Sequence, residues 1–213
     1  MFVITKLSPT KSGRMAVFFN GHFDFSVDME TAVLQNLTVG REFTGPEYDA
    51  LRGDASYRQA REKAFRLLSY KSYTSAMLAQ RLSQDFAPET VEDVIARLQE
   101  LGLLNDADYA LRCGRDFINL KKYSLQRVGQ ELRRRGIDPC TVEDTLAALE
   151  EEDDPGERIR QIIMKKYLRG LGEEKGRRRA VNGLVRLGYR YEDIKREISA
   201  VLEEYGEENS WVE

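Results

Sequence analysis

Cysteine, histidine and tryptophan are scarce in this chain of 213 residues, which contains two, one and one of them, respectively. Cys113 and Cys140 have no second pair of cysteines with which to build a zinc site. We therefore expect two free, buried or half-buried thiols in a reducing compartment. His22 lies beside a predicted hairpin turn, so neither a Cys–His nor a Ser–His–Asp arrangement has its usual base.

Long apolar runs and an excess of one charge are also missing. No segment approaches the ~20 apolar residues of a membrane span. The N-terminal stretch MFVITKLSPTKSGR lacks the basic start and long apolar run of a signal peptide. The formal net charge is −3, so any contact with nucleic acid must come from local basic faces. We expect a soluble, cytoplasmic monomer.

Catalytic and cofactor-binding motifs are equally hard to find. The nearest approach to a phosphate loop, GLGEEKGR (170–177), lacks the Lys-Ser/Thr ending and has glutamates where backbone amides should meet phosphate. Acidic pairs are plentiful, but most occupy exposed helical positions without apolar neighbours that would raise a pKa. The sequence therefore predicts a protein that is not an enzyme and that binds no cofactor and no metal.

The only β-rich stretch is the N-terminal one. Asn20-Gly21 is the strongest short hairpin signal, because both central positions of such a turn favour φ > 0. Apolar runs at 2–7 and 15–19 precede it, and an alternating run follows it. Three apolar residues of that run share one face: Phe23, Phe25 and Val27. Residues 1–46 are therefore predicted to form a small cap of three strands.

Capping boxes mark the start of the helical part. Thr44 with Glu47, and Ser56 with Gln59, have the required spacing of three residues. We place the start of the helical body at Ser56. At the other end of the chain, Gly206 is expected to end the last helix.

The stretch 102–149 is typical of three helices in a row. Asn105 or Asp106 can cap the first helix, and Ser124 can cap the second. Gly136 ends the second, because glycine adopts a positive φ without strain. An Asp-Pro pair then opens the third, with proline at the first helical position.

The same unit occurs on both sides of this stretch. Counted from Phe86, Ile137 and Tyr189, apolar residues recur five, nine and twelve positions later in all three copies. Random helical sequence would not hold three such registers, so the chain is predicted to be mostly α-helical with a triplicated three-helix unit. Stacked repeats would form an elongated, curved body. The predicted parts are a cap (1–46), three repeats (56–104, 105–152 and 154–206) and a tail (207–213) that holds Trp211.

Three segments of the repeats have sequence motifs in common with a known family: GLLNDADYA (102–110), QELRRRGI (130–137) and LVRLGYRYEDI (184–194). They resemble the RecX family, the bacterial regulators of the RecA recombinase, and the resemblance covers roughly residues 56 to 205. It implies a role in DNA repair, recombination and the SOS response. It also implies that the helical body lodges in the groove of the RecA–DNA filament, bridges protomers, and hinders strand exchange and ATP turnover.

Arginines repeat at equivalent positions of two second helices. On a helical wheel, Arg127 and Arg134 lie within about 20° of each other on an outer flank, and Arg179 and Arg186 occupy the same flank one repeat later. Guanidinium groups bind carboxylates and phosphates bidentately, so we expect these four to face the partner. Further basic residues surround them: Lys121, Lys122, Arg133, Arg135, Arg177 and Arg178. The alternative is an ordinary solvated face, for which arginine is a good helix former.

A run of five acids, Glu150–Asp154, separates the second and third repeats and is followed by Pro155. Like charges repel one another and proline interrupts a helix. The run therefore predicts either an exposed helix end and linker, or an extended, solvated segment about which the third repeat can shift.

Two functions remain open from the sequence. The first is a non-enzymatic regulator that binds the RecA filament and mainly inhibits it, with which weak DNA contact is compatible. The second is a helix-turn-helix-like module that binds DNA directly, without a recombinase. We rank the second lower, because the acidic composition and the run of five acids oppose phosphate binding.

Overall fold

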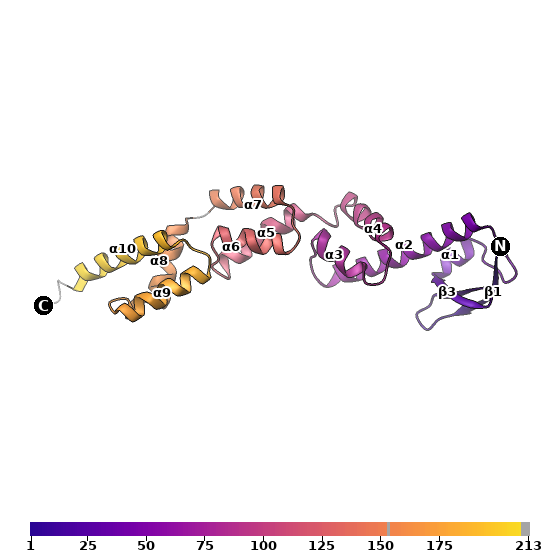
Figure 1. Ribbon diagram of the computed structural model, residues 1–213, viewed down its shortest axis with the longest axis horizontal. Coiled ribbons are helices and arrows are strands. Elements are labelled where there is room, and N and C mark those ends of the chain that lie inside the picture. The colour runs from indigo at the N-terminus through magenta and orange to yellow at the C-terminus, as the bar shows by residue number, and fades with distance from the viewer. Residues whose placement is uncertain (153, 210–213) are drawn as a thin grey trace. The chain divides into compact units, whose positions relative to one another are not determined.

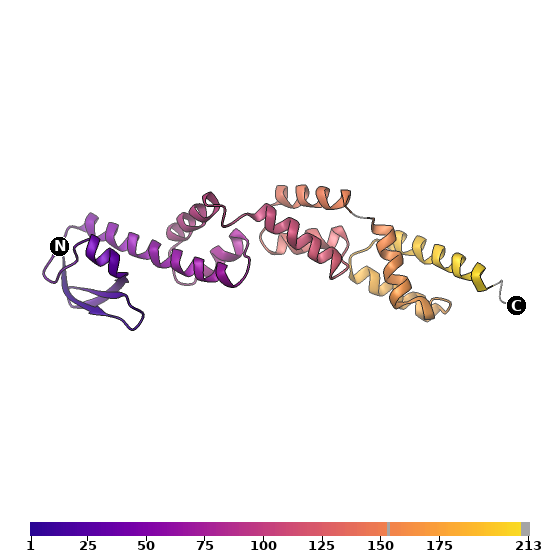
Figure 2. The same ribbon diagram turned by 180° about the vertical axis from the view of Figure 1, so that it is seen from behind.

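The computed structural model describes residues 1–152 and 154–209, with side chains as far as residue 205. Helices make up most of this chain, and the described strands all lie in its N-terminal part (Figures 1 and 2). Two compact units are present, Met1–Leu104 and Asn105–Glu213. The expected fold class, three-helix repeats with a small β-rich cap, is confirmed.

The first unit begins with a four-stranded antiparallel sheet in the order β3-β2-β1-β4. The strands are β1 (Phe2–Pro9), β2 (Met15–Phe19), β3 (His22–Val27) and β4 (Glu42–Phe43). The predicted hairpin turn is confirmed, with φ of 49° at Asn20 and 90° at Gly21. The sequence does not predict β4, because a strand of two residues carries no alternating pattern.

A bulge in the hairpin corrects one predicted position. Phe25 pairs with Val17 but Phe23 pairs with Phe18, so Asp24 is an extra residue in β3. The extra residue reverses the alternation, and Phe23 is 58% exposed while Phe25 is 8% exposed. The expectation that Phe23 shares the buried face of Phe25 is therefore wrong. Asp24 accepts a hydrogen bond from the hydroxyl of Tyr48 on the next long helix.

Two helices follow in the chain. Asp28 caps α1 (Met29–Leu34), and Thr44 with Glu47 forms the predicted capping box of α2 (Gly45–Tyr70). The second predicted box is wrong, because Ser56 lies within α2 and starts no helix. One apolar stripe runs through the whole of α2, first against the sheet and then into the first repeat, so an uninterrupted helix buries more surface than two short ones.

Polar contacts also tie the sheet to α2. The guanidinium of Arg14 lies 2.6 Å from the carboxylate of Glu62. The side-chain amide of Gln59 donates to the carbonyl of Ser26 at 2.6 Å. The sheet and the first repeat therefore share one helix and are joined along it.

The first repeat combines the second half of α2 with α3 (Ser75–Leu82) and α4 (Pro88–Glu100). Thr74 caps α3. The buried apolar residues form one cluster: Ala60, Ala64, Leu78, Leu82, Val91, Val94, Leu98 and Leu104. Each helix thus contributes a single buried stripe, which explains how a chain with 32% charged residues folds.

The second unit contains two further clusters of the same kind. Its elements are α5 (Asp106–Asn119), α6 (Leu125–Arg134), α7 (Pro139–Glu151), α8 (Pro155–Lys166), the 3-10 turn η1 (Leu168–Gly170), α9 (Glu174–Arg186) and α10 (Tyr191–Asn209). Asn105 and Ser124 are the caps of α5 and α6, as predicted. Gly136 has φ of 75° after α6, also as predicted. None of the described helices is long and apolar enough to cross a membrane.

The run of acids is not an extended segment. α7 continues through Glu151, and Asp154 caps α8 by accepting from the amides of Gly156 and Glu157. Glu152 accepts two hydrogen bonds from the guanidinium of Arg115, at 2.9 and 2.6 Å, which lower the pKa of its carboxyl group. The predicted extended segment is therefore wrong for Glu150 and Glu151, which continue α7, and all four described acids are exposed, so the alternative of an exposed helix end is confirmed. Asp153 lies outside the described residues.

The last helix is longer than predicted. α10 continues to Asn209, so Gly206 is inside it and does not end it. A glycine within a helix costs about 1 kcal/mol relative to alanine, which the surrounding helical turns can outweigh. Trp211 lies outside the described residues.

The second and third repeats meet where the turn before α6 contacts the turn after α9. Ser124 donates its amide to the carbonyl of Leu187 at 2.9 Å and its hydroxyl to that of Gly188 at 2.7 Å. Tyr189 donates its hydroxyl to the carbonyl of Lys122 at 3.0 Å. Burial raises the pKa of this tyrosine, and the neighbouring guanidinium of Arg158 opposes that effect. We call this contact the joint.

Gly188 has a conformation and surroundings that exclude a side chain. Its φ is 95°, and a Cβ there would lie 2.5 Å from the Ser124 hydroxyl and 2.7 Å from the Cβ of Arg127. We expect Gly188→Ala to cost about 1–2 kcal/mol through backbone strain, and about 1–3 kcal/mol more through the clash. Hydrogen exchange of the Ser124 amide should therefore accelerate.

Gly102→Ala is the matched control, since Gly102 has φ of 68° and open space around its Cα. It should show the strain alone and leave exchange at Ser124 unchanged. Equal exchange at Ser124 in both variants would contradict the close approach at the joint.

Candidate partner-binding surface

The predicted arginines of α6 converge on one carboxylate. Glu131 has a side chain that is 17% exposed, and it pairs with Arg127 at 3.1 Å, Arg134 at 3.3 Å and Arg135 at 3.4 Å. Spacings of three and four residues bring all of them to the same side of the helix. Glu131 was not among the predicted site residues, although its spacing from the arginines is visible in the sequence.

Arg127 does not occupy the outward position that was predicted. Its side chain is 31% exposed, and its Nε is buried without a hydrogen-bond partner among the described residues. The guanidinium lies 5.5 Å from the centre of the Tyr123 ring, and Gly188 packs against the Cβ. The turn of the third repeat therefore covers Arg127, at one end of the arginine stripe formed by Arg127 and Arg134. A helical wheel drawn for α6 alone cannot show this contact.

The other basic residues near α6 differ in their exposure and in the contacts that their side chains make. Arg134, with a side chain 66% exposed, is the freest of the three that pair with Glu131. Arg133 is exposed, whereas Arg135 lies over the ring of Phe117 at 4.7 Å. Lys121 is exposed and also lies near Phe117, at 5.1 Å, and Lys122 is half-buried at the joint. Aromatic contacts therefore hold several of these cations in place.

The two arginines of α9 at the positions equivalent to Arg127 and Arg134 lack the carboxylate partner that the α6 pair has. Arg179 and Arg186 are exposed, and neither makes an ion pair or a side-chain hydrogen bond with a described residue. Gly183 stands at the position equivalent to Glu131, and the hydroxyl of Tyr167 fills its place, 2.1 Å from where a Cβ would be. Position 183 therefore does not accommodate a side chain such as that of Glu131 between the two arginines.

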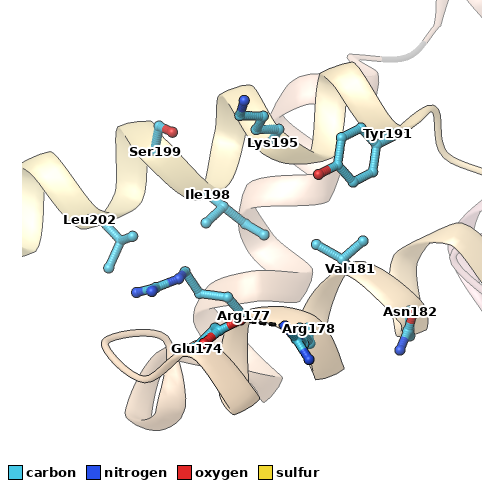
Figure 3. Close-up of a pocket in the computed structure, with 10 residues that line it drawn as sticks. All are labelled: Glu174, Arg177, Arg178, Val181, Asn182, Tyr191, Lys195, Ile198, Ser199 and Leu202. Atoms are coloured by element: carbon cyan, nitrogen blue, oxygen red, sulfur yellow. Dashed lines mark hydrogen bonds and ion pairs between the residues drawn. The ribbon is translucent and has the colours of Figure 1, made fainter.

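Arg177 and Arg178 line a groove between α9 and α10 (Figure 3). Its volume is about 590 Å³. Arg177 donates to the carbonyl of Gly172 at 3.0 Å, and Arg178 pairs with Glu174. The apolar side chains of the groove are Val181, Ile198 and Leu202, and Figure 3 shows them between the two helices.

The predicted residues of α9 do not form a single patch. Arg179 follows Arg178 by one residue and thus lies about 100° further round the helix. Arg178 belongs to the groove, whereas Arg179 and Arg186 belong to a separate flank. A partner that occupies the groove and one that lies on the stripe would therefore contact different sides of α9.

The two thiols were not among the predicted site residues. Cys113 is half-buried, as expected, and burial raises the pKa of its thiol. Cys140 is exposed in the first turn of α7, so the expectation of a buried or half-buried thiol is wrong there. The first turn of a helix can face solvent when only one stripe of that helix is buried.

The fold and these surfaces define a class: a protein of tandem three-helix units, in two of which the second helix is basic. Family models of the first and the second three-helix domain of RecX match residues 60–98 and 105–146. The chain belongs to the RecX family. The resemblance read from the sequence is thereby confirmed.

Individual relatives extend the match over most of the chain. The regulatory protein RecX of Caldanaerobacter subterraneus is 30% identical over 170 residues, covering 78% of this chain and 84% of the relative. That of Clostridioides difficile is 28% identical over 206 residues, covering 95% and 97%.

Solved structures share the fold. A crystal structure of a regulatory protein RecX has a TM-score of 0.65 and 23% identity, covering 92% of this chain and all of that one. The crystal structure of RecX from Lactobacillus salivarius has a TM-score of 0.61 and 22% identity, covering 68% and 96%.

Glu131→Gln tests the carboxylate at the centre of the α6 cluster. The change releases three arginines, so the variant should bind a polyanion such as heparin more tightly and elute at higher salt. Glu143→Gln is the matched control, because Glu143 is an exposed residue of α7 and the substitution changes the net charge by the same amount. If both variants eluted from heparin at the same salt concentration, the proposed role of Glu131 in neutralising the arginines of α6 would be contradicted.

Proposed function

We propose that this protein is a non-enzymatic regulator that binds the groove of the RecA–DNA filament and mainly inhibits its recombinase activity. Membership of the RecX family and the relatives' name, regulatory protein, support a regulatory role. The observation that carries the assignment of the surface is that Arg179 and Arg186 are exposed and make no ion pair with a described residue.

The chemistry of this pair fits a filament. Free guanidinium groups suit carboxylates and phosphates, and a nucleoprotein filament offers both. Arg134 is exposed enough to join them, although it shares Glu131. Arg127 stabilises the joint, and we assign it a smaller part in binding than the sequence suggested. We further propose that the protein acts in the cytoplasm as a monomer.

Co-sedimentation with preformed filaments tests the partner. Free recombinase and free DNA are the controls. The protein should pellet with filaments and slow their ATP turnover and strand exchange. Failure to pellet with filaments, in a protein that is folded by circular dichroism, would refute the proposal.

Substitution of the α9 pair tests the surface. Each of Arg179→Ala and Arg186→Ala should weaken filament binding by about 1–3 kcal/mol, the range for a charge-assisted hydrogen bond. Stability should change by less than about 0.5 kcal/mol, since both positions are exposed. Exchange to glutamate should weaken binding further, and exchange to lysine should restore it only partly.

Arg81→Ala is the matched control. Arg81 is an exposed arginine of a second helix, α3, whose guanidinium donates to the Gln84 amide oxygen at 3.2 Å. It lies in the register of Glu131 and Gly183, where the charge is not repeated. Binding equal to the parent in the double variant of Arg179 and Arg186 would show that the stripe is an ordinary solvated face.

The second candidate function is direct DNA binding. The exposed Arg133 and Arg134 on α6 favour it, because helix-turn-helix proteins use a basic second helix. Dominant phosphate contact would give affinity for bare DNA that falls steeply with salt, whereas filament binding would require the recombinase. Because the net charge of −3 opposes binding to bare DNA, we rank filament binding first.

A further inference from the structure

A cleft of about 310 Å³ opens beside the joint between the second and third repeats. The turn after α5 contributes Leu120 and Lys122, and α8 contributes Arg158, Lys165 and Lys166. No aspartate or glutamate is among the described residues that line it. The cleft therefore collects basic side chains from two repeats.

This charge pattern is unusual for the chain. Acids outnumber bases, 36 to 33, and the arginines of α6 share a glutamate. The lysines at 122, 165 and 166 make no ion pair with any described residue, in contrast to Lys63. Several like charges around one cleft repel each other, and an anion in the cleft would remove that repulsion.

A purely structural explanation accounts for only part of the cluster. Lys165 and Lys166 form the last turn of α8, where a cation offsets the helix dipole by about 0.3–1 kcal/mol. Lys122 follows the end of α5, whose dipole it offsets in the same way, but the dipoles of two separate helices do not explain why these lysines meet at one cleft. Only the tertiary structure brings Lys122 to the same cleft.

The frame of the cleft is fixed. Lys122 has φ of 60°, and its backbone donates to the Ile118 carbonyl at 3.1 Å and accepts from the Tyr189 hydroxyl at 3.0 Å. Arg158 is 6% exposed and donates to the Tyr123 carbonyl at 2.8 Å. A site held this way needs little ordering when a ligand binds.

We propose that the cleft binds a backbone phosphate of single-stranded DNA, with Lys122, Lys165 and Lys166 around the phosphate. Lysines act as point charges and suit phosphate, whereas planar recognition of carboxylate favours arginine. Leu120 lines the cleft and is 77% exposed as a residue, so it offers an apolar contact to the adjoining sugar or base.

The shape of the site favours a single strand over a duplex. A flexible strand can turn one phosphate into a concave site and place its base on a neighbouring apolar surface. The phosphates of a duplex lie on a convex cylinder with their bases stacked inside. The inference concerns bare DNA, so it goes beyond filament binding and does not depend on it.

Fluorescence anisotropy with a labelled oligo-deoxythymidine, over a series of salt concentrations, tests the cleft. The double variant Lys165→Gln/Lys166→Gln should bind about tenfold more weakly, and the slope of log K against log salt should become shallower by up to about 1.4. Lys122→Asn should also weaken binding, since asparagine keeps the positive φ without the charge.

The control is Lys11→Gln/Lys175→Gln, which removes the same charge at exposed positions outside the cleft. It should keep the parent's affinity and slope. Three results would overturn the proposal: no saturable binding by the parent, cleft variants that match this control, or equal loss of affinity for the corresponding duplex.

Competition identifies the chemistry of the ligand. Inorganic phosphate should displace the oligonucleotide from the parent more effectively than poly-glutamate at equal charge. The reverse order would overturn the assignment to phosphate. In co-sedimentation, the double lysine variant should retain the filament binding carried by Arg179 and Arg186, which separates a failure of the cleft from a failure of the proposed function.

Discussion

Three hydrogen bonds to backbone carbonyls join the turn before α6 to the turn after α9, and both the covering of Arg127 and the cleft beside Lys122 depend on this contact. Ser124 caps α6 and also donates to the carbonyls of Leu187 and Gly188. The two turns come this close because Gly188 has no side chain and adopts a positive φ. The apolar cores of the two repeats are separate clusters, so these polar contacts orient one repeat against the other.

The joint and the local carboxylates decide which basic residues are free to bind a partner. The arginine pairs of α6 and α9 share one sequence register, but Glu131 pairs with both arginines of α6, whereas Gly183 supplies no carboxylate and the α9 pair has no ion-pair partner among the described residues. A charged pair at a protein surface adds little to stability, but it lowers the charge that a partner meets. The freedom of Arg179 and Arg186 is therefore more informative about binding than the number of arginines on either helix.

The sequence by itself determined the local structure and the family. The caps at Asn105 and Ser124 and the turns at Gly21 and Gly136 are confirmed. Each depends on a backbone requirement that a few neighbouring residues satisfy, such as an orphan amide or a positive φ. The triplicated apolar register was readable for the same reason, because each repeat builds its own small core.

Only the tertiary structure decided how these local pieces meet. It made Ser56 internal to α2, turned Phe23 outward through a bulge, covered Arg127, and brought Lys122 beside α8. The candidate surface was thus predictable as a set of basic helix positions, but not as a set of free charges. The physical reason is that burial and charge pairing depend on residues distant in sequence, whose approach is set by packing and not by the periodicity of any one helix.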